Sequence, residues 1–509
     1  MGYFAGLDVG TSGVKAMAFD AAGKTISYAY QSYPLLTPRD GWCELDAEQI
    51  WSACCAVLQT LAAETDGQLL TVAVSSPAQA VVPLAADGTA LYHFITTVDS
   101  RTLPQLRWWQ EHGDEETFQC RTGLPFSSIY AVNKIMWLQE HEPELCARVW
   151  KYLCIGDFIT WKLTGRTMID RSLAGRGMMM NVHDFDWDPL VLDYAGIRRE
   201  RLPEIVPSGT AAGTVRPALA RELGLPAELN VVVGAHDQTC GTIGCGISRV
   251  GQVMNATGTV EVLDALAPEV PSREKLLRYH YPCSPYIAAD GHLVMSINQS
   301  GGLLLKWYKE AFCQWECACA AREGVDPYTY IIDHSADTIS DIYVLPHLNG
   351  AETPIQDAAA AGAFLHLRSC HTKADITRGL LDSLAYELRA NVEALRDAGC
   401  AVDEIRAIGG GARTPKFLQI KADVCQVPVY AMQVSEAAAL GAAIVGAVGG
   451  GYFGSYAEAI AAMVQVGRLY TPDSRNKDEY DAHFREYTQF YPALRDIHHQ
   501  IAGRLDRRH

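Results

Sequence analysis

The feature that most constrains this chain is an acid placed where a short apolar strand meets a turn of small and hydroxyl residues. Tyr3-Phe4-Ala5-Gly6-Leu7 predicts a strand, Asp8 follows it, and Val9-Gly10-Thr11-Ser12-Gly13-Val14-Lys15 predicts a turn. Amides of a glycine-containing turn can approach phosphate oxygens, hydroxyls can donate to them, and a carboxylate can hold Mg²⁺ or its water shell. The same residues also suit an ordinary hairpin turn, and the tract alone leaves both interpretations open.

The residues after this turn predict a three-stranded meander followed by a helix. Strands are expected over residues 15–19 and 25–30, and Asp46 has the form of an N-cap for a helix that runs to about Ala63. An apolar run over residues 69–74 then predicts a buried strand. Strands mixed with amphipathic helices indicate an α/β layer architecture.

A second strand–turn–strand pattern with Gly and Thr at the bend lies near residue 250. Strands are expected over residues 252–256 and 260–263, joined by Thr257-Gly258-Thr259. The repeat is short, but it suggests two related domains. Because a chain of 509 residues is too long to fold around a single hydrophobic core, we expect two domains, residues 1–247 and 248–509.

A candidate for a reactive carboxylate lies at the junction of these two domains. The apolar strand over residues 231–235 ends at His236-Asp237-Gln238, and a small, Gly-rich segment follows. A carboxylate at a strand end can accept a proton from a bound substrate. His236 could touch that substrate, although a structural histidine is the favoured interpretation.

A run of glycines near residue 410 predicts a second site. A strand over residues 405–408 leads into Gly409-Gly410-Gly411-Ala412, and Pro415 is suitably placed to open a helix that runs to Asp423. Bare glycine backbone admits a flat ligand or a phosphate. A flexible loop would use the same residues, but the strand–glycine–helix context favours a binding site.

Asp375 is a possible N-cap for the long core helix that precedes this strand.

Composition argues against several classes of partner. The 42 basic and 59 acidic residues give a formal charge of −17 without a basic patch, so we expect neither nucleic acid nor an acidic membrane as partner. The Ala- and Gly-rich run over residues 437–451 is too short to span a bilayer comfortably and predicts a tightly packed helix.

The fifteen cysteines predict reduced thiols rather than disulfides. The chain starts without a charged and apolar leader, so we expect a cytoplasmic protein. Cys313, Cys317 and Cys319 could form a metal site, but no second ligand pair follows at zinc-finger spacing. Buried or half-buried thiols are the favoured interpretation.

Taken in order along the chain, these tracts resemble the FGGY carbohydrate kinases, a family within the group of actin-like, Hsp70-like and sugar-kinase folds. The resemblance covers nearly the whole chain and rests on the order and spacing of residues 6–12, 99–101, 234–238, 300–302, 350–354 and 409–423. It implies two ribonuclease-H-like (actin-like ATPase) domains of α/β type with ATP in an interdomain cleft. It also implies Mg²⁺, and a small-molecule sugar held mainly by the N-terminal domain.

The same resemblance implies roles for individual residues. Asp237 looks like the general base and Asp8 like the acid near Mg²⁺. The implied nucleotide contacts are Thr11, Ser12 and Lys15 in one phosphate loop, Thr257, Gly258 and Thr259 in a second, Gly302, and Gly410, Gly411 and Ala412 at the adenosine. The sugar contacts are expected from Ala78, Gln79, Asp99, Arg101, Asp237 and Gln238. A base within reach of a sugar hydroxyl accelerates its reaction by about 10²- to 10⁴-fold.

The acceptor is less well defined than the donor. Residues 41–46 and 133–138 look most like those of xylulokinases, which implies a ketopentose and D-xylulose above all. However, Ala78-Gln79 stands where xylulokinases typically carry Met-His, and Gln238 follows the base, as in glycerol kinases, where xylulokinases usually have Asn. The alternatives are another polyol or sugar acid, such as glycerol, gluconate, ribulose or erythritol, or a catalytically silent sugar- and nucleotide-binding regulator. A homodimer is a family expectation.

Overall fold

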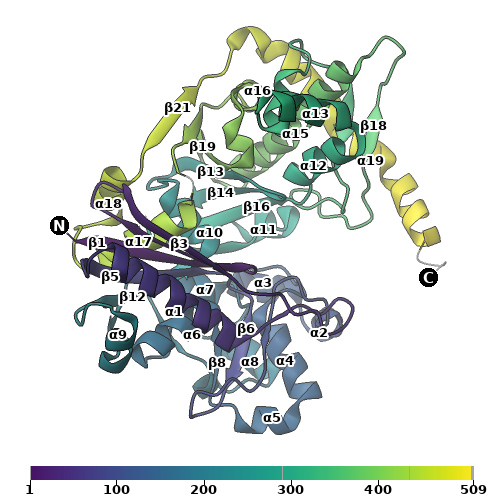
Figure 1. Ribbon diagram of the computed structural model, residues 1–509. Helices are drawn as coiled ribbons and strands as arrows, with labels where there is room; N and C mark the ends of the chain where they lie inside the picture. Colours follow the sequence, from purple (N-terminus) through teal and green to yellow (C-terminus); the bar gives the residue numbers. More distant parts are fainter. Residues whose placement is uncertain (1, 289–290, 435, 506–509) are drawn as a thin grey trace. The chain divides into compact units, whose positions relative to one another are not determined.

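The computed structural model describes residues 2–288, 291–434 and 436–505, and its contacts divide the chain into two compact units (Figure 1). The first unit comprises Met1–Ser248, Pro282–Leu293 and Glu436–Gln465, and the second comprises Arg249–Tyr281, Val294–Ser435 and Val466–His509. The domain boundary predicted between residues 247 and 248 stays a prediction. By contacts, two segments from the second half of the chain pack with the first unit.

The first unit is built on a mixed sheet in which strands follow the order β11-β12-β5-β1-β2-β3, with β11 (Ala211–Thr214) at one edge. The predicted meander is confirmed, because β1 (Tyr3–Val9), β2 (Gly13–Phe19) and β3 (Thr25–Ser32) pair antiparallel in sequence. β5 (Leu69–Ser76) runs parallel to both β1 and β12 (Asn230–His236). The carboxyl ends of β1, β5 and β12 therefore meet at one edge of the sheet.

Helices cover this sheet with apolar side chains and close backbone contacts. α1 (Ala47–Glu64) lies along the sheet (Figure 1), and the Asp46 side chain caps it by accepting from the amides of Glu48 and Gln49. α17 (Ala437–Gly449) packs against β1 and against α10 (Asp237–Gly244). A Cβ atom at Gly441 would lie 1.8 Å from the carbonyl oxygen of Cys240. The tight packing predicted for residues 437–451 is therefore present.

Smaller elements complete the first unit. A second sheet has the order β4-β7-β6-β8 and consists of β4 (Glu44–Leu45), β7 (Phe94–Ile95), β6 (Val81–Leu84) and β8 (Lys151–Cys154). α4 (Ala131–His141) packs near β6, and the short α7 (Arg171–Gly175) packs against β12. None of the helices in the described part of the chain combines the length and hydropathy needed to cross a membrane.

The second unit repeats the strand–turn–strand theme at its centre. β13 (Gly251–Thr257) and β14 (Glu261–Ala267) form the predicted antiparallel hairpin. β13 also runs parallel to β19 (Val402–Gly409), which runs parallel to β20 (Val429–Met432). The glycine run predicted as a binding site thus follows a strand directly beside β13.

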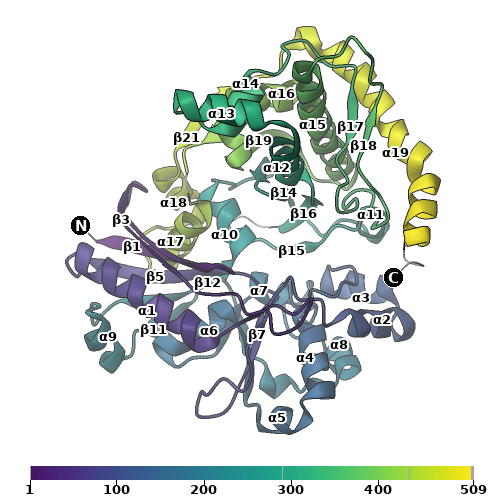
Figure 2. The same ribbon diagram turned by 45° about the vertical axis from the view of Figure 1, so that its right-hand side comes forward.

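Helices gather on one side of the second unit's sheet (Figure 2). α15 (Lys373–Asp397) is the predicted core helix, and its Leu380, Leu384 and Leu388 side chains are buried. The N-cap predicted at Asp375 is wrong. Thr372 caps the helix, and Asp375 completes a capping box by accepting from the Thr372 amide at 2.7 Å. A carboxylate can accept from a free amide both at the N-cap and three residues later, so the sequence pattern did not distinguish these two positions for Asp375.

Candidate active site

Two carboxylates, Asp8 and Asp237, lie at the carboxyl edge of the first unit's sheet. Asp8 is the penultimate residue of β1, and Asp237 begins α10 directly after β12. Both strands flank β5, whose Ser75 donates from Oγ to Asp8 Oδ1 at 3.0 Å. Burial and the negative charge of Asp237 raise the pKa of Asp8 to about 6. The two acids predicted from the sequence are therefore close enough to interact electrically.

Asp237 is held in its charged form by its neighbours. His236 Nε2 lies 3.0 Å from Asp237 Oδ1, and the Gln238 amide donates to the same oxygen at 2.7 Å. Burial acts to raise the pKa of Asp237, but His236, the Gln238 amide and the charge of Arg176 outweigh it and hold that pKa below its ordinary value. With 36% of its side chain exposed, this ionised carboxylate can accept a proton from a ligand.

The turn between β1 and β2 places hydroxyls beside Asp8. Thr11 and Ser12 are exposed, and the Gly10 amide donates to the Gly13 carbonyl at 2.9 Å to close the turn. Lys15 lies on β2 opposite Asp8 rather than in the turn, and its Nζ forms a 2.7 Å ion pair with Glu436. The structure therefore brings the predicted phosphate loop and Asp8 together, with Lys15 already paired.

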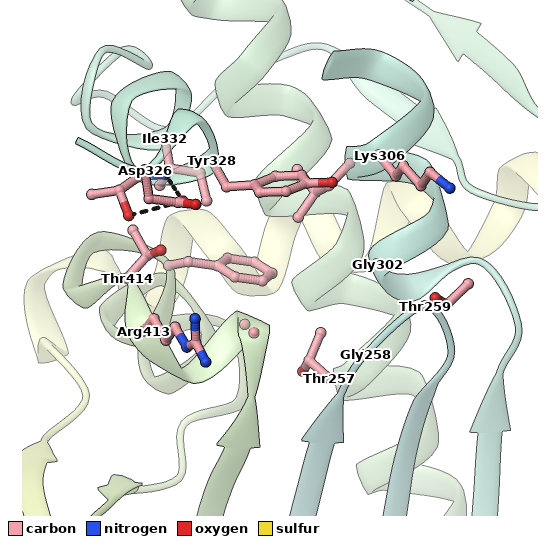
Figure 3. A pocket seen from close by; sticks show the side chains of 15 residues that line it. Thr257, Gly258, Thr259, Gly302, Lys306, Asp326, Tyr328, Ile332, Arg413 and Thr414 are labelled. Carbon is pink, nitrogen blue, oxygen red and sulfur yellow. Dashed lines mark hydrogen bonds between the residues drawn. The ribbon is translucent and has the colours of Figure 1, made fainter. Parts of the chain in front are cut away.

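The second unit contains a cavity of about 310 Å³ where its predicted nucleotide residues converge (Figure 3). Thr257, Gly258 and Thr259 reach it from the β13–β14 turn, and Gly302 reaches it from the start of α12 (Gly301–Phe312). Gly410 and Gly411 contribute from the turn after β19, whereas Ala412 is not among the lining residues. Two glycine turns and a helix start thus wall one pocket.

Close backbone approach explains why these positions are glycine. A Cβ atom at Gly302 would lie 1.8 Å from the carbonyl oxygen of Gly258. At Gly411 it would lie 2.6 Å from Cβ of Thr257. Both distances are far below van der Waals contact, so neither turn accommodates a side chain at these positions.

Comparison with known proteins assigns this combination of folds and turns to a family. Residues 3–244 match the N-terminal domain model of the FGGY family of carbohydrate kinases, and residues 256–450 match its C-terminal domain model. The chain belongs to the FGGY carbohydrate kinases. It is accordingly a phosphotransferase with an alcohol group as acceptor, in a family that uses ATP as phosphate donor, typically with Mg²⁺.

Relatives of this FGGY kinase span its full length. A xylulose kinase of Staphylococcus epidermidis is 27% identical over 497 residues, which cover 97% of each chain. A glycerol kinase of Gloeobacter violaceus is 30% identical over 478 residues, which cover 92% of each. The solved structure of a xylulose kinase from Rhodospirillum rubrum matches with a TM-score of 0.88 at 26% identity and covers 98% of this chain and all of that one. The predicted actin-like fold is thereby confirmed.

The predicted sugar loop of the kinase follows β5 and is buried. Ala78 is fully buried and Gln79 is 5% exposed. Lys134 Nζ donates to the Gln79 carbonyl at 2.6 Å, and Cys154 Sγ donates to the Ala78 carbonyl at 3.3 Å. Contact of Ala78 and Gln79 with a sugar stays a prediction, but the structure fixes the loop that carries them.

Asp99 and Arg101 use most of their hydrogen-bonding capacity on protein groups. Arg101 donates to both oxygens of Asp99, at 2.9 and 2.7 Å, and to Glu44 at 2.7 Å. The guanidinium lies 3.7 Å from the ring centroid of Trp42, which completes the enclosure. A direct sugar contact from this pair stays a prediction, because its observed contacts only support the surrounding loops.

The carboxylates of the first unit fit a magnesium ion. Burial first, and then the negative charge of Asp237, raise the pKa of Asp8, and a divalent cation would offset both effects. Among the residues that the structure describes, no three His, Cys, Asp or Glu side chains converge as a metal cage. Mg²⁺ needs none, since it binds through one or two carboxylates, water and substrate phosphates. Asp8 is therefore a suitable ligand.

Several residues that line the second-unit pocket were missed from the sequence. Tyr328 lies across the cavity from Thr257 and Arg413, near Lys306 (Figure 3). Tyr328 belongs to α14 (Pro327–Asp333), whose Asp326 cap accepts from the Thr329 amide at 3.0 Å. The Asp-Pro pair signals a helix start, but no local pattern indicates that this helix walls a pocket with residues 70 positions away.

A buried lysine fixes the turn that is predicted to be the second phosphate loop. Lys421 Nζ is fully buried and donates to Glu261 at 2.6 Å, to Asn255 at 2.7 Å and to Thr257 Oγ1 at 2.9 Å. The ion pair with Glu261 compensates the buried charge. Lys421 thereby connects α16 (Pro415–Cys425) to the turn that begins at Thr257.

Proposed function

We propose that this FGGY kinase transfers the γ-phosphoryl group of ATP to D-xylulose and releases D-xylulose 5-phosphate and ADP. The observation that carries the proposal is the pair of carboxylates at the edge of the first sheet, with Asp237 ionised and Asp8 of raised pKa. The choice of acceptor is supported by full-length xylulose kinase relatives and by the xylulokinase-like residues 41–46 and 133–138.

The two acids take different parts in this reaction. Asp237 accepts the proton of the attacking hydroxyl, because its low pKa keeps it ionised and its exposed oxygen is free to face a substrate. Asp8 holds Mg²⁺, which when bound neutralises charge on the transferred phosphoryl group. Thr11 and Ser12 donate to phosphate oxygens from the adjoining turn.

The second unit supplies the nucleotide site in this proposal. Thr257, Gly258 and Thr259 bind phosphates, Gly302 contacts the nucleotide, and Gly410, Gly411 and Ala412 lie by the adenosine. The 310 Å³ cavity with aromatic and glycine walls supports this assignment. Because Ala412 does not line the cavity, its part would be to shape the turn.

A second acceptor class has support of its own. The glycerol kinase relative has the higher identity, and Gln238 and Ala78-Gln79 depart from the xylulokinase pattern. A smaller polyol or a sugar acid is therefore the competing substrate. A silent regulator is disfavoured, because a protein that only binds has no need for a base kept in its charged form.

A substrate panel tests the proposal. The purified protein is given ATP, Mg²⁺ and D-xylulose, D-ribulose, L-ribulose, glycerol, erythritol or gluconate, and ADP release is measured. We expect the highest kcat/KM with D-xylulose. A kcat/KM for another member at least about a hundredfold higher, a gap that corresponds to about 2.7 kcal/mol of transition-state binding, would overturn the assigned acceptor.

A further inference from the structure

We propose that Arg176 binds the acceptor sugar, donating from its guanidinium to substrate oxygens next to the hydroxyl that Asp237 deprotonates. The inference rests on the proposed function in so far as it takes the sugar to lie beside Asp237. It adds a positively charged donor to a site whose predicted members are two carboxylates, two amides, an alanine and an enclosed arginine.

The fold fixes Arg176 close to Asp237. Arg176 follows directly after α7, which packs against β12. Ser172 on α7 accepts through Oγ from the backbone amide of His236 at 2.9 Å, and His236 is the residue before Asp237. Asp170 caps α7 by accepting from the amides of Ser172 at 2.7 Å and Leu173 at 3.1 Å. The end of α7 is thus tied to the strand end that carries the base.

The Arg176 side chain is buried without a protein acceptor. Only 6% of the residue is exposed, and its Nε atom is shielded from solvent and has no hydrogen-bond partner among the described residues. Among the described residues no carboxylate forms an ion pair with Arg176, although the positive charge of Arg176 helps to lower the pKa of Asp237. A buried guanidinium nitrogen without a partner is costly, and we infer that its acceptor arrives with the ligand.

The other two arginines that are buried in the described part of the chain, Arg101 and Arg378, are paired, whereas the half-buried Arg201 shares the unpartnered Nε of Arg176. Arg101 lies 2.7 Å from both Asp99 and Glu44, and Arg378 lies 2.8 Å from Asp382. Both therefore complete their hydrogen bonding within the protein. Arg176 differs from them in having charge and donors available where the mechanism places the substrate.

The chemistry of guanidinium defines what Arg176 would bind. Its donors form a planar fork that matches two neighbouring oxygens, such as the adjacent oxygens of a ketose or the carboxylate of a sugar acid. The proton of the reacting hydroxyl still passes to Asp237, and Arg176 keeps its own protons throughout. Arg176 is therefore a specificity-determining residue that holds the acceptor in place for attack.

Arg176→Met tests the assignment through stability and binding together. Removing a buried unpaired charge should leave the thermal unfolding midpoint of the ligand-free protein unchanged or higher. The upward shift of that midpoint on adding the best sugar of the panel should disappear, and kcat/KM for that sugar should fall about 10- to 100-fold. The Kd for ATP should stay within about twofold, and Arg176→Lys should keep part of the sugar shift.

Arg121→Met is the matched control. Arg121 Nε lies 2.8 Å from the buried Asp188, so this variant breaks a pair without touching the site. We expect Arg121→Met to have a lower unfolding midpoint than the wild-type protein. Adding sugar should raise that midpoint by as much as it does in the wild type. If Arg176→Met behaves like this control, Arg176 is structural and the proposal fails.

The remaining outcomes also decide the question. Loss of ATP affinity with an intact sugar shift in the Arg176 variants would overturn the sugar assignment. If Arg176→Met does not fold, the test uses Arg176→Lys instead. An Arg176→Lys protein whose unfolding midpoint rises with sugar as much as that of the wild type, and whose kcat/KM equals that of the wild type, would contradict the proposal. If a sugar raises the unfolding midpoint of the wild-type protein but no sugar is phosphorylated, only the proposed function is contradicted. The comparison with the Arg176 variants still measures sugar binding in that case. Wild-type protein that neither shifts with nor phosphorylates any sugar contradicts both.

Discussion

Single buried lysines hold the loops that carry candidate site residues. Lys134 is fully buried and donates to the carbonyl oxygens of Gln79 at 2.6 Å and Ile129 at 2.8 Å. In the second unit, Lys421 donates to the Thr257 hydroxyl at 2.9 Å. Neither function could be predicted from the sequence, because a lysine within a helical pattern indicates a solvated face unless its long-range neighbours are known.

The pH dependence of stability tests the burial of Lys134. Burial lowers the pKa of Lys134 from 10.5 to about 7. Between these values the unfolded chain binds the proton and the folded chain does not, so folding becomes more favourable as pH rises. The free energy of unfolding of the wild type relative to Lys134→Met should therefore rise from pH 7 to pH 10, by at most about 1.4 kcal/mol per pH unit.

Urea unfolding of both proteins at several pH values measures this difference. Subtracting the Lys134→Met values removes the other titrating groups, which the two proteins share. A difference that does not change with pH would mean that the amine keeps its ordinary pKa in the folded protein. A difference that falls with rising pH would contradict the predicted sign.

At the level of elements, the site is built from turns that the sequence identifies and from pairings that it does not. The turn after β1, the β13–β14 hairpin and the glycine run after β19 were all predicted from Gly, Thr and apolar alternation. The strand order that brings Asp8 and Asp237 to one sheet edge depends on the pairing of β5 with β12, which begins more than 150 residues after β5 ends. Local patterns carry no information on such pairings.

Tyr328 provides a test of the pocket that those turns form. Its ring lies across the cavity from the glycine turn (Figure 3), so we expect it to pack against the nucleotide. Tyr328→Ala should raise the KM for ATP about tenfold, because loss of one aromatic contact to a base costs about 1–3 kcal/mol. Steady-state kinetics with either substrate varied give both constants. An unchanged KM for ATP, or a rise in the KM for sugar alone, would show that the cavity is not the nucleotide site.

The close packing of α17 against α10, the helix that begins with the proposed base Asp237, can be tested by substitution. Gly441→Ala should destabilise the protein by about 1–3 kcal/mol, because its Cβ would lie 1.8 Å from the Cys240 carbonyl oxygen. Gly503→Ala in α19 (Lys477–Leu505) is the matched control, since nothing lies within 4 Å of its Cβ. It should stabilise by up to about 1 kcal/mol. Equal effects of the two substitutions on the unfolding midpoint would contradict the close packing.

For the whole molecule, the predicted site residues are divided between the two units. The first unit contains the carboxylate pair, and the second contains the glycine-walled cavity. The sequence has a strand–turn–strand signal near the start of each unit, and the boundary predicted between residues 247 and 248 stays a prediction. It could not predict that Glu436–Gln465 packs with the first unit, since that depends on backbone contacts between α17, α10 and β1.

The rate at which Asp237→Asn phosphorylates D-xylulose at saturating ATP and Mg²⁺ decides whether Asp237 is the general base. Loss of the base should lower kcat by about 10²- to 10⁴-fold, since asparagine cannot accept the hydroxyl proton. The Kd for ATP, measured on the same protein, should match the wild type because the cavity lies in the other unit. A kcat within tenfold of wild type would contradict the assignment of Asp237 and, with it, the proposed mechanism.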